Sequence, residues 1–238
     1  MDREGWMTLL DLGEDEVPRL LVLEGTWWRQ KALDTRLPLL TEVRELGMPD
    51  LWHGWYGDVP VAYCPAYGAS RAVEPVHVLG TIGTANVVQI GSCGSLQPGV
   101  RTGDIVLSER ATIGEGASQY YGGKAVAEAN LGRVARAASL LAARGMYAHR
   151  GPTVTTSALL AQPPELLRRW ANAGHLAVDM ETSAVFSAAR AFGMRAASVL
   201  FVWDELPGRS WVDSFTAEEE RAQARAGAAV YEIALEMG

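Results

Sequence analysis

The sequence predicts an α/β protein, a three-layer α/β/α sandwich with a mixed, mainly parallel central sheet. Short apolar runs alternate with amphipathic or alanine-rich segments along the whole chain. Several of the apolar runs stop at a glycine or an acidic residue, which is typical of strand ends in such sheets. No linker, repeat or low-complexity segment divides the 238 residues. Residues 1–238 are therefore predicted to form a single domain.

The elements are expected in the following order. A polar lead precedes a strand at 20–23, which ends at Gly25, and a helix is expected around 27–33. Gly57-Asp58 is typical of a hairpin turn between two strands. The other expected elements are strands at 52–56, 59–64, 87–90, 105–107, 146–154, 176–180 and 196–203, and helices at 70–79, 126–144, 164–173, 182–192 and 216–237. Pro75 is expected to kink or shorten the helix at 70–79.

Two acidic residues follow apolar runs near the C-terminal end of the chain. Glu181 opens the alanine-rich helix at 182–192, and Asp204 ends the strand at 196–203. A strand–helix–strand unit predicts parallel neighbouring strands, and ligands bind beyond the carboxyl ends of such strands. Glu181, at a helix N-terminus, is expected to accept hydrogen bonds from a sugar diol, and burial is expected to raise the pKa of Asp204. The alternative is that both are ordinary turn and helix-start charges.

Composition excludes several classes of function. The formal net charge of -7 and the pI near 5.2 argue against a nucleic-acid-binding surface. No apolar run approaches the roughly 20 residues of a membrane span, and Met1–Glu16 is too acidic for a signal peptide. Cys64 and Cys93 show no metal-like spacing, and the four histidines form no HxxxH motif, so no metal site is expected. A reducing, cytoplasmic compartment is expected.

Two glycine-rich segments follow predicted strands. Gly91-Ser92-Cys93-Gly94 can expose backbone N–H groups and the Ser92 hydroxyl to an anion. Gly25 is followed one helical turn later by Arg29. Neither segment is a GxGxxG or GxxxxGK[ST] motif, so neither predicts a dinucleotide or P-loop site. Taken alone, each is more commonly a turn than an anion site.

Taken in order, these segments resemble the nucleoside phosphorylase superfamily, in the branch of hexameric bacterial purine nucleoside phosphorylases and uridine phosphorylases. The resemblance covers about residues 20–235, including the loop at 91–94, Gly103-Asp104-Ile105-Val106, and Asp179-Met180-Glu181. It implies a phosphorylase-like fold and the following sites. Phosphate would be bound by Gly25, Arg29, Arg44, Gln89 and Ser92, ribose by Asp179, Met180, Glu181 and Ser92, and the base by Cys93, Gly94, Leu159, Val178 and Asp204. Asp204, supported by Arg221, would be catalytic.

Several residues depart from the family pattern. Gln89 stands where phosphorolytic members carry an arginine, and it supplies no charge; Arg71 is a candidate replacement. Leu159 stands where purine enzymes often stack an aromatic ring on the base. Asp179 replaces the usual glutamate. Trp203 replaces a small polar residue and, by strand alternation, is expected to point away from Asp204 into the core.

The N-terminal part departs as well. Trp27 and Trp28 replace a tight proline turn, and the histidine that many members lend to a neighbour's ribose is absent, with His53 as a weak substitute.

The resemblance implies purine nucleoside phosphorylase activity: phosphorolysis of a (deoxy)ribonucleoside to free base and (deoxy)ribose 1-phosphate. Inorganic phosphate would be a co-substrate, and no metal or organic cofactor is expected. Arg44 would complete the neighbouring site in a homo-oligomer, a hexamer built as three dimers or a dimer. The alternatives are a nucleosidase, a uridine phosphorylase, or a catalytically silent nucleoside-binding protein. A uridine phosphorylase needs a glutamine–arginine pair at the pyrimidine edge, and the sequence places none near Leu159.

Overall fold

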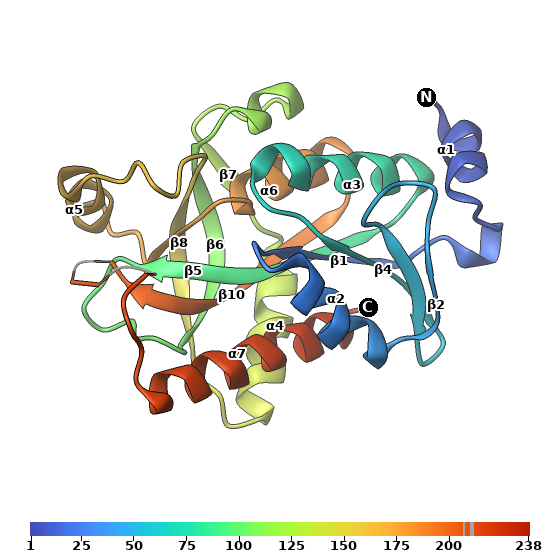
Figure 1. Cartoon of the computed structure of the whole chain (residues 1–238). Coiled ribbons are helices and arrows are strands. Elements are labelled where there is room, and N and C mark those ends of the chain that lie inside the picture. Colours follow the sequence, from blue (N-terminus) through green and yellow to red (C-terminus); the bar gives the residue numbers. More distant parts are fainter. Residues whose placement is uncertain (207, 210–211) are drawn as a thin grey trace.

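The structure is a computed structural model that describes residues 1–206, 208–209 and 212–238. Its strands form one mixed sheet in the order β10-β6-β8-β9-β5-β1-β4-β3-β2, with β7 paired to β6 (Figure 1). The strands are β1 (Leu20–Gly25), β2 (Thr41–Glu45), β3 (Trp52–Tyr56), β4 (Val59–Pro65), β5 (Asn86–Ser95), β6 (Ile105–Gly114), β7 (Val126–Glu128), β8 (Ala148–Thr156), β9 (Ala177–Asp179) and β10 (Arg195–Glu205). The longest pairings, β5 with β10 and β6 with β8, are parallel.

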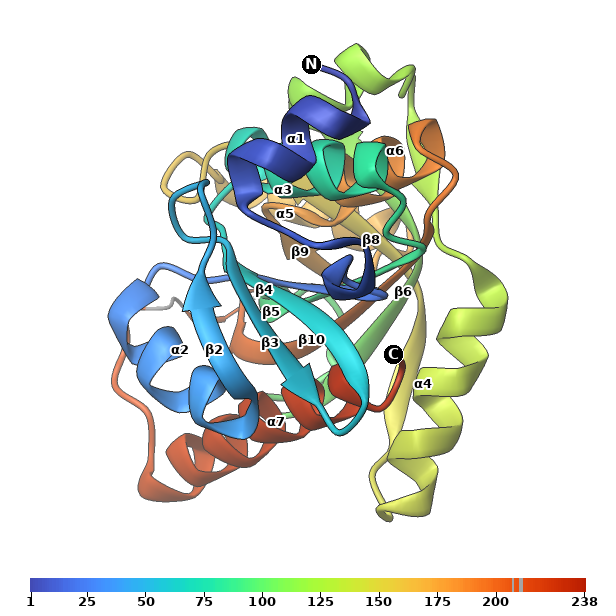
Figure 2. The ribbon, with the colours of Figure 1, turned by 90° about the vertical axis from the view of Figure 1, so that its right-hand side faces the viewer.

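The α-helices lie on both faces of the sheet. They are α1 (Arg3–Leu10), α2 (Arg29–Arg36), α3 (Ala69–Ile82), α4 (Leu131–Ala143), α5 (Pro164–Asn172), α6 (Thr182–Ala191) and α7 (Ala217–Leu235). One core cluster joins α1, α3 and α6 to the sheet, and a second joins α4 and α7 to its other face. Figure 2 shows α1 outside α3 on the first side, and α2 and α7 on the second. The predicted three-layer sandwich is confirmed.

The middle of the sheet opens beside β5. The first half of β5 pairs with β1 as far as Gly25, which lies opposite Gly91. Beyond that point Gly94 and Ser95 pair with the short antiparallel strand β9 instead. On its other side, β5 pairs with β10 along the whole length of β5. Because β10, β6, β8, β9 and β5 are also paired in that order, these five strands close into a ring. The pairing partner of β5 thus changes from β1 to β9 between Gly91 and Gly94. The ends of β1, β9 and β10 therefore meet beside this part of β5.

Gly91 makes this arrangement possible. Its φ of +153° is one that other residues rarely adopt, and a Cβ there would lie 2.7 Å from the carbonyl oxygen of Gly25. Any side chain at this position would push β1 and β5 apart.

Most predicted elements are present, with four corrections. The region 126–144 is not one helix: Val126–Glu128 pairs with β6, and α4 begins after Asn130, whose side chain accepts the N–H of Arg133. The lead forms α1, and β2 was not predicted. Pro75 lies inside the 14-residue α3 and does not shorten it.

The fourth correction concerns β9 and β10, which are neither neighbours nor parallel. β9 runs antiparallel to β5 and β10 runs parallel to it, on opposite sides of that strand. The helix α6 therefore connects two antiparallel strands that do not pair, and the strand–helix–strand pattern alone did not set their direction.

In the described part of the chain, no helix is both long enough and apolar enough to cross a membrane.

Candidate functional site

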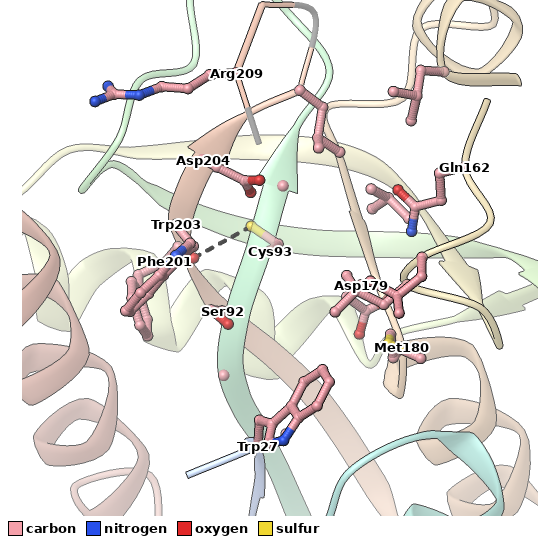
Figure 3. A pocket seen from close by; sticks show the side chains of 18 of the residues that line it. Trp27, Ser92, Cys93, Gln162, Asp179, Met180, Phe201, Trp203, Asp204 and Arg209 are labelled. Atoms are coloured by element: carbon pink, nitrogen blue, oxygen red, sulfur yellow. Dashed lines mark hydrogen bonds between the residues drawn. The ribbon is translucent and has the colours of Figure 1, made fainter. Parts of the chain in front are cut away.

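A pocket of about 880 Å³ lies where β1, β5, β9 and β10 end (Figure 3). Its volume falls in the range of roughly 300–1,000 Å³ that is usual for small-molecule sites. Ten of the predicted site residues line it: Gly25, Ser92, Cys93, Gly94, Leu159, Val178, Asp179, Met180, Glu181 and Asp204. Arg29, Arg44, Gln89 and Arg221 do not line it.

Asp204 lies at one end of the pocket on β10. A register shift between Val202 and Asp204 places Asp204 opposite Gly94 and leaves Trp203 as the extra residue. Asp204 is 5% exposed, and burial raises the pKa of its carboxyl to about 7, with a further rise from Asp213 and a decrease from Arg209. A carboxyl with this pKa can hold a proton at neutral pH and donate it to a leaving group.

The register shift also corrects the expectation for Trp203. Strand alternation predicts a core side chain, but the extra residue breaks the alternation, and Trp203 lines the pocket. Its ring lies 6.3 Å from Phe201, which also lines the pocket, and 6.0 Å from Phe215, measured between centroids.

Glu181 lies at the start of α6 with its side chain buried against two glycines. Its Oε1 accepts the backbone N–H of Gly68 over 2.7 Å. Its Oε2 would lie 2.3 Å from a Cβ at position 25, so only glycine fits there. Burial, followed by the charge of Asp179, raises the pKa of Glu181 to about 8. Glu181 lines the pocket, so its carboxyl can accept hydrogen bonds from a polar ligand there.

Asp179 has a different role from Glu181. Its carboxylate accepts the hydroxyls of Thr155 and Thr182 over 2.7 and 2.6 Å. It also accepts the backbone N–H groups of Glu181 and Thr182 over 3.1 and 2.7 Å. Burial raises its pKa, and these four hydrogen bonds oppose that rise. Asp179 thus anchors the start of α6 and holds negative charge beside Glu181.

The residues expected at phosphate are only partly together. Gly25 and Ser92 line the pocket, but Gln89 is fully buried and accepts the hydroxyls of Thr182 and Ser198. Gln89 therefore points toward α6, away from the cavity.

The three candidate cations are engaged elsewhere. Arg29 pairs with Asp50, and Arg44 pairs with Glu16 over 2.9 Å and donates to the carbonyl of Asp11. Arg71 pairs with Glu74. Of the described residues that line the pocket, the basic ones are Arg168 and Arg209, from α5 and the segment after β10.

Arg209 takes the position beside Asp204 that the resemblance assigned to Arg221. Arg221 is exposed on α7, whereas Arg209 lines the pocket and lowers the pKa of Asp204. Glu219 holds Arg209 by an ion pair, and the guanidinium lies 4.5 Å from the ring centroid of Phe215. The sequence signal was a basic residue five positions after the acid, in a loop rich in turn residues.

Other lining residues were also missed. Gln162 and Arg168 both line the pocket, although the sequence placed no glutamine–arginine pair near Leu159. Tyr67 lines it from the segment before α3. His53 does not: it is buried, and its Nε2 lies 3.0 Å from the carbonyl oxygen of Glu16. Among the residues that the structure describes, no group of three or more histidine, cysteine or acidic side chains is placed to hold a metal ion.

Comparisons with known proteins agree with this geometry. A family model described as "Phosphorylase superfamily" matches residues 34–235. The chain is 30% identical over 132 residues to a DeoD-type purine nucleoside phosphorylase of Caldanaerobacter subterraneus subsp. tengcongensis, covering 55% of this chain and 57% of that protein. It is 26% identical over 151 residues to the DeoD-type enzyme of Bacillus cereus (strain ZK / E33L), covering 63% and 61%. The alignments thus span about three fifths of these relatives.

Solved structures show the same fold. Uridine phosphorylase from Vibrio fischeri ES114 superposes with a TM-score of 0.82 at 22% identity, over 95% of this chain and 94% of that one. A second structure of that enzyme, in complex with 6-hydroxy-1-naphthoic acid, gives a TM-score of 0.81 at 21% identity, over 95% and 93%.

Proposed function

Because the chain belongs to the phosphorylase superfamily, we propose that it cleaves the N-glycosidic bond of a purine nucleoside by phosphorolysis. The products are the free base and (deoxy)ribose 1-phosphate. The observation that carries this proposal is the buried carboxyl of Asp204, whose pKa of about 7 suits proton donation to a base. It lies in the same pocket as Glu181, at the far side of Ser92 and Cys93 from Trp27 (Figure 3).

The base is proposed to lie at the Asp204 end. Bond cleavage leaves negative charge on the purine, and protonation by Asp204 neutralises that charge as it develops. Arg209 is proposed as the cation that supports Asp204, because its positive charge lowers the pKa of that carboxyl. The apolar side chains of Leu159, Val178 and Phe201 line the remaining walls and exclude water.

The ribose is proposed to lie against Glu181. Its carboxylate is placed to accept the 2′- and 3′-hydroxyls, which fixes the sugar ring relative to the base. A charged acceptor forms stronger hydrogen bonds than a neutral one, so the substrate favours the ionised form of Glu181. Cleavage makes the sugar cationic, and the carboxylates of Glu181 and Asp179 stabilise that charge.

Phosphate is proposed to lie near Gly25 and Ser92. Backbone N–H groups at glycine turns and the Ser92 hydroxyl are suitable donors to an anion. The missing charge has two sources in this proposal: Arg29, which is half exposed and must leave Asp50, and Arg44 of a neighbouring subunit.

Hydrolysis by water is the second candidate, and one observation favours it. The described residues that line the pocket near Gly25 include Glu24 and Glu181 but no arginine or lysine. A phosphate dianion is costly to bury without cations, whereas a neutral water molecule is not.

A pyrimidine base is a third possibility for the same chemistry. Gln162 and Arg168 line the pocket together, and such a pair can read the polar edge of a pyrimidine. Uridine therefore belongs in any substrate screen.

One screen tests these proposals. Inosine, adenosine, guanosine and uridine are incubated with and without phosphate, and both base and sugar products are measured. The proposal predicts purine release that depends on phosphate, with sugar 1-phosphate as product. Free ribose at an equal rate in both conditions selects the hydrolase, and release of uracil alone selects the pyrimidine enzyme.

The assembly is proposed to be a homo-oligomer, a hexamer or a dimer, in the cytoplasm. The side chain of Arg44 is about one third exposed and lies outside the pocket of its own chain, and in this proposal it completes the site of a neighbouring subunit. The free thiols of Cys64 and Cys93 fit a reducing compartment. Light scattering that finds a fully active monomer would rule out a shared site.

A further inference from the structure

Glu205 follows the acid Asp204 at the end of β10 and is bonded to the loop that precedes β6. Its Oε1 accepts the backbone N–H of Thr102 over 3.2 Å and the hydroxyl of Thr102 over 3.3 Å. Its Oε2 accepts a hydrogen bond from the guanidinium of Arg101 over 3.1 Å. One carboxylate thus joins the last residue of β10 to the segment 101–104, which we call the β6 loop.

The β6 loop is also bonded to β10 just before the register shift. The N–H of Gly103 donates to the carbonyl oxygen of Val202 over 2.9 Å, and the N–H of Val202 donates to the carbonyl oxygen of Asp104 over 2.9 Å. Val202 is the last residue in register with β5 before the shift, and Glu205 lies after it. The shifted part of β10 is therefore held at both of its ends by one loop.

The β6 loop can serve as an anchor because it is packed tightly against α7. Gly103 has a φ of +85°, and a Cβ there would lie 2.5 Å from the Cβ of Ala222 in α7. The next residue of that helix, Gln223, donates to the carbonyl oxygen of Trp203 over 2.8 Å. The helix α7 therefore fixes the extra residue of the bulge, and the β6 loop fixes the strand on both sides of it.

This arrangement sets the direction of Asp204. Its Oδ1 lies 3.1 Å from the place that a Cβ would take at Gly94, and Figure 3 shows the carboxyl pointing from β10 toward the end of β5. A one-residue change of register would turn Asp204 to the other face of the sheet. We infer that Glu205 is a positioning residue for the reaction: it holds the bulge in place and thereby directs the Asp204 carboxyl at the base. This inference rests on the proposed function.

The charges that act on Asp204 come from other residues. Burial raises the pKa of Asp204 to about 7, and the described groups whose charges shift that pKa are Asp213 and Arg209. Glu205 is not one of them. A change in the pKa of Asp204 when Glu205 is replaced therefore reports a change in the burial of the acid.

The test is a double-mutant cycle between Glu205 and Asp204, measured as kcat and KM for inosine at saturating phosphate. Glu205→Ala removes the anchor and should lower kcat by about 10- to 100-fold with little change in KM, because a small displacement of the acid affects the transition state more than substrate binding. In the Asp204→Asn background the same substitution should have almost no further effect, since the group that Glu205 positions is already absent. An equal loss in both backgrounds would show a purely structural role and overturn the inference.

Three further variants separate the possible contributions of Glu205. Glu205→Gln removes the charge but keeps an oxygen that accepts from Thr102, so kcat should stay near that of the wild type. A loss as large as in Glu205→Ala would assign the effect to charge and contradict the inference. Arg101→Ala breaks an ion pair whose arginine side chain is 69% exposed, and it should change nothing.

The third variant, Thr102→Val, removes only the hydroxyl donor and should give a smaller loss of kcat than Glu205→Ala. It also decides the inference if Glu205→Ala does not fold. A loss of kcat that disappears in the Asp204→Asn background then supports the inference, and an unchanged kcat contradicts it.

The pH profile is a second readout. The acid must be protonated, so kcat/KM should fall as pH rises through the pKa of Asp204. A displaced carboxyl gains water and its pKa decreases, so in Glu205→Ala this fall should occur about one pH unit lower. Glu205→Gln should keep the profile of the wild type.

A binding-independent measurement separates this inference from the proposed function. Carbon NMR of protein labelled at its aspartate carboxyls follows the titration of Asp204, whose signal is identified by its absence in Asp204→Asn. If no nucleoside is cleaved, the proposed function fails and this titration decides the inference. A lower pKa in Glu205→Ala then supports the positioning of Asp204 by Glu205, and an unchanged pKa contradicts it.

Discussion

The hydroxyl oxygen of Thr182 lies 2.9 Å from the side-chain oxygen of Gln89, so the first turn of α6 contacts the middle of β5. The hydroxyl of Ser198 on β10 donates to the same oxygen. Gln89 thus joins three elements beneath the pocket and does not line it. The resemblance implied a phosphate-binding role for Gln89, whereas in the structure its side chain is bonded to the protein itself.

Gln89→Met is expected to lower stability and leave phosphate use unchanged. Methionine fills similar space but accepts no comparable hydrogen bond, so buried hydroxyls lose a partner at a cost of about 1–3 kcal/mol. Denaturant unfolding measures the free energy of unfolding, and initial rates over a range of phosphate concentrations give its KM. A large rise in that KM with unchanged stability would show that Gln89 binds phosphate.

Arg29 should contribute to phosphate binding only when it is released from Asp50. Asp50→Asn removes the competing carboxylate and should lower the KM for phosphate, while Arg29→Ala should raise it sharply. Both variants break the same ion pair, but one frees the cation and the other removes it, so each is the control for the other. Identical KM values in both variants would exclude Arg29 from the phosphate site.

Glu181 should make the protein less stable as pH rises. Its pKa is raised from 4.5 to about 8 in the folded state, so the protonated form stabilises the fold at low pH. That contribution is complete below the unfolded pKa and is lost as pH rises through about 8. Glu181→Gln carries no such charge, and its Tm should exceed that of the wild type more at about pH 9 than at about pH 5.

The same variant should be nearly inactive, because an amide is a weaker acceptor for the sugar diol. Thermal unfolding across pH and a cleavage assay check both expectations. An equal Tm difference at every pH would mean that Glu181 is ionised throughout.

Arg209, and not Arg221, should influence the acid. Removing the positive charge in Arg209→Gln raises the pKa of Asp204, so the pH maximum of kcat/KM should move upward and kcat should fall by up to about tenfold. Arg221→Gln is the matched control, since Arg221 is exposed and does not line the pocket. If the Arg221 variant shows the larger effect, the side chain must reach the site in the working assembly.

The sequence predicted the fold well because periodicity reports which faces are buried. The strand at β1 and the hairpin of β3 and β4 needed only apolar runs and a turn at Gly57-Asp58. The prediction failed at β9, where Ala177 and Val178 pair with the end of β5, because the direction of strand pairing depends on segments that are distant in sequence. The helix predicted over 126–144 was placed too early for the same reason: α4 spans Leu131–Ala143, and Val126–Glu128 pairs with β6 instead.

Some residues of the candidate site could be predicted from the sequence, and others could not. Gly25, Ser92, Glu181 and Asp204 all line the pocket, as expected, because they lie in or just after the C-terminal parts of β1, β5, β9 and β10. The positions of the charged side chains were harder to predict, because the ion pairs that long side chains form depend on the tertiary structure. Arg29 pairs with Asp50, twenty-one positions away, and Arg209 reaches the pocket from the segment after β10.

Asp204 is the centre of this account, and the most direct test is purine release by Asp204→Asn. Cleavage of inosine in phosphate buffer is followed by absorbance, with the fold checked by circular dichroism and Asp58→Asn as a control at an exposed carboxyl outside the pocket. Loss of the acid should reduce kcat/KM by about 10²–10⁴ while the control retains most activity. Wild-type rates in a folded Asp204→Asn protein would contradict the assignment of Asp204 as the acid.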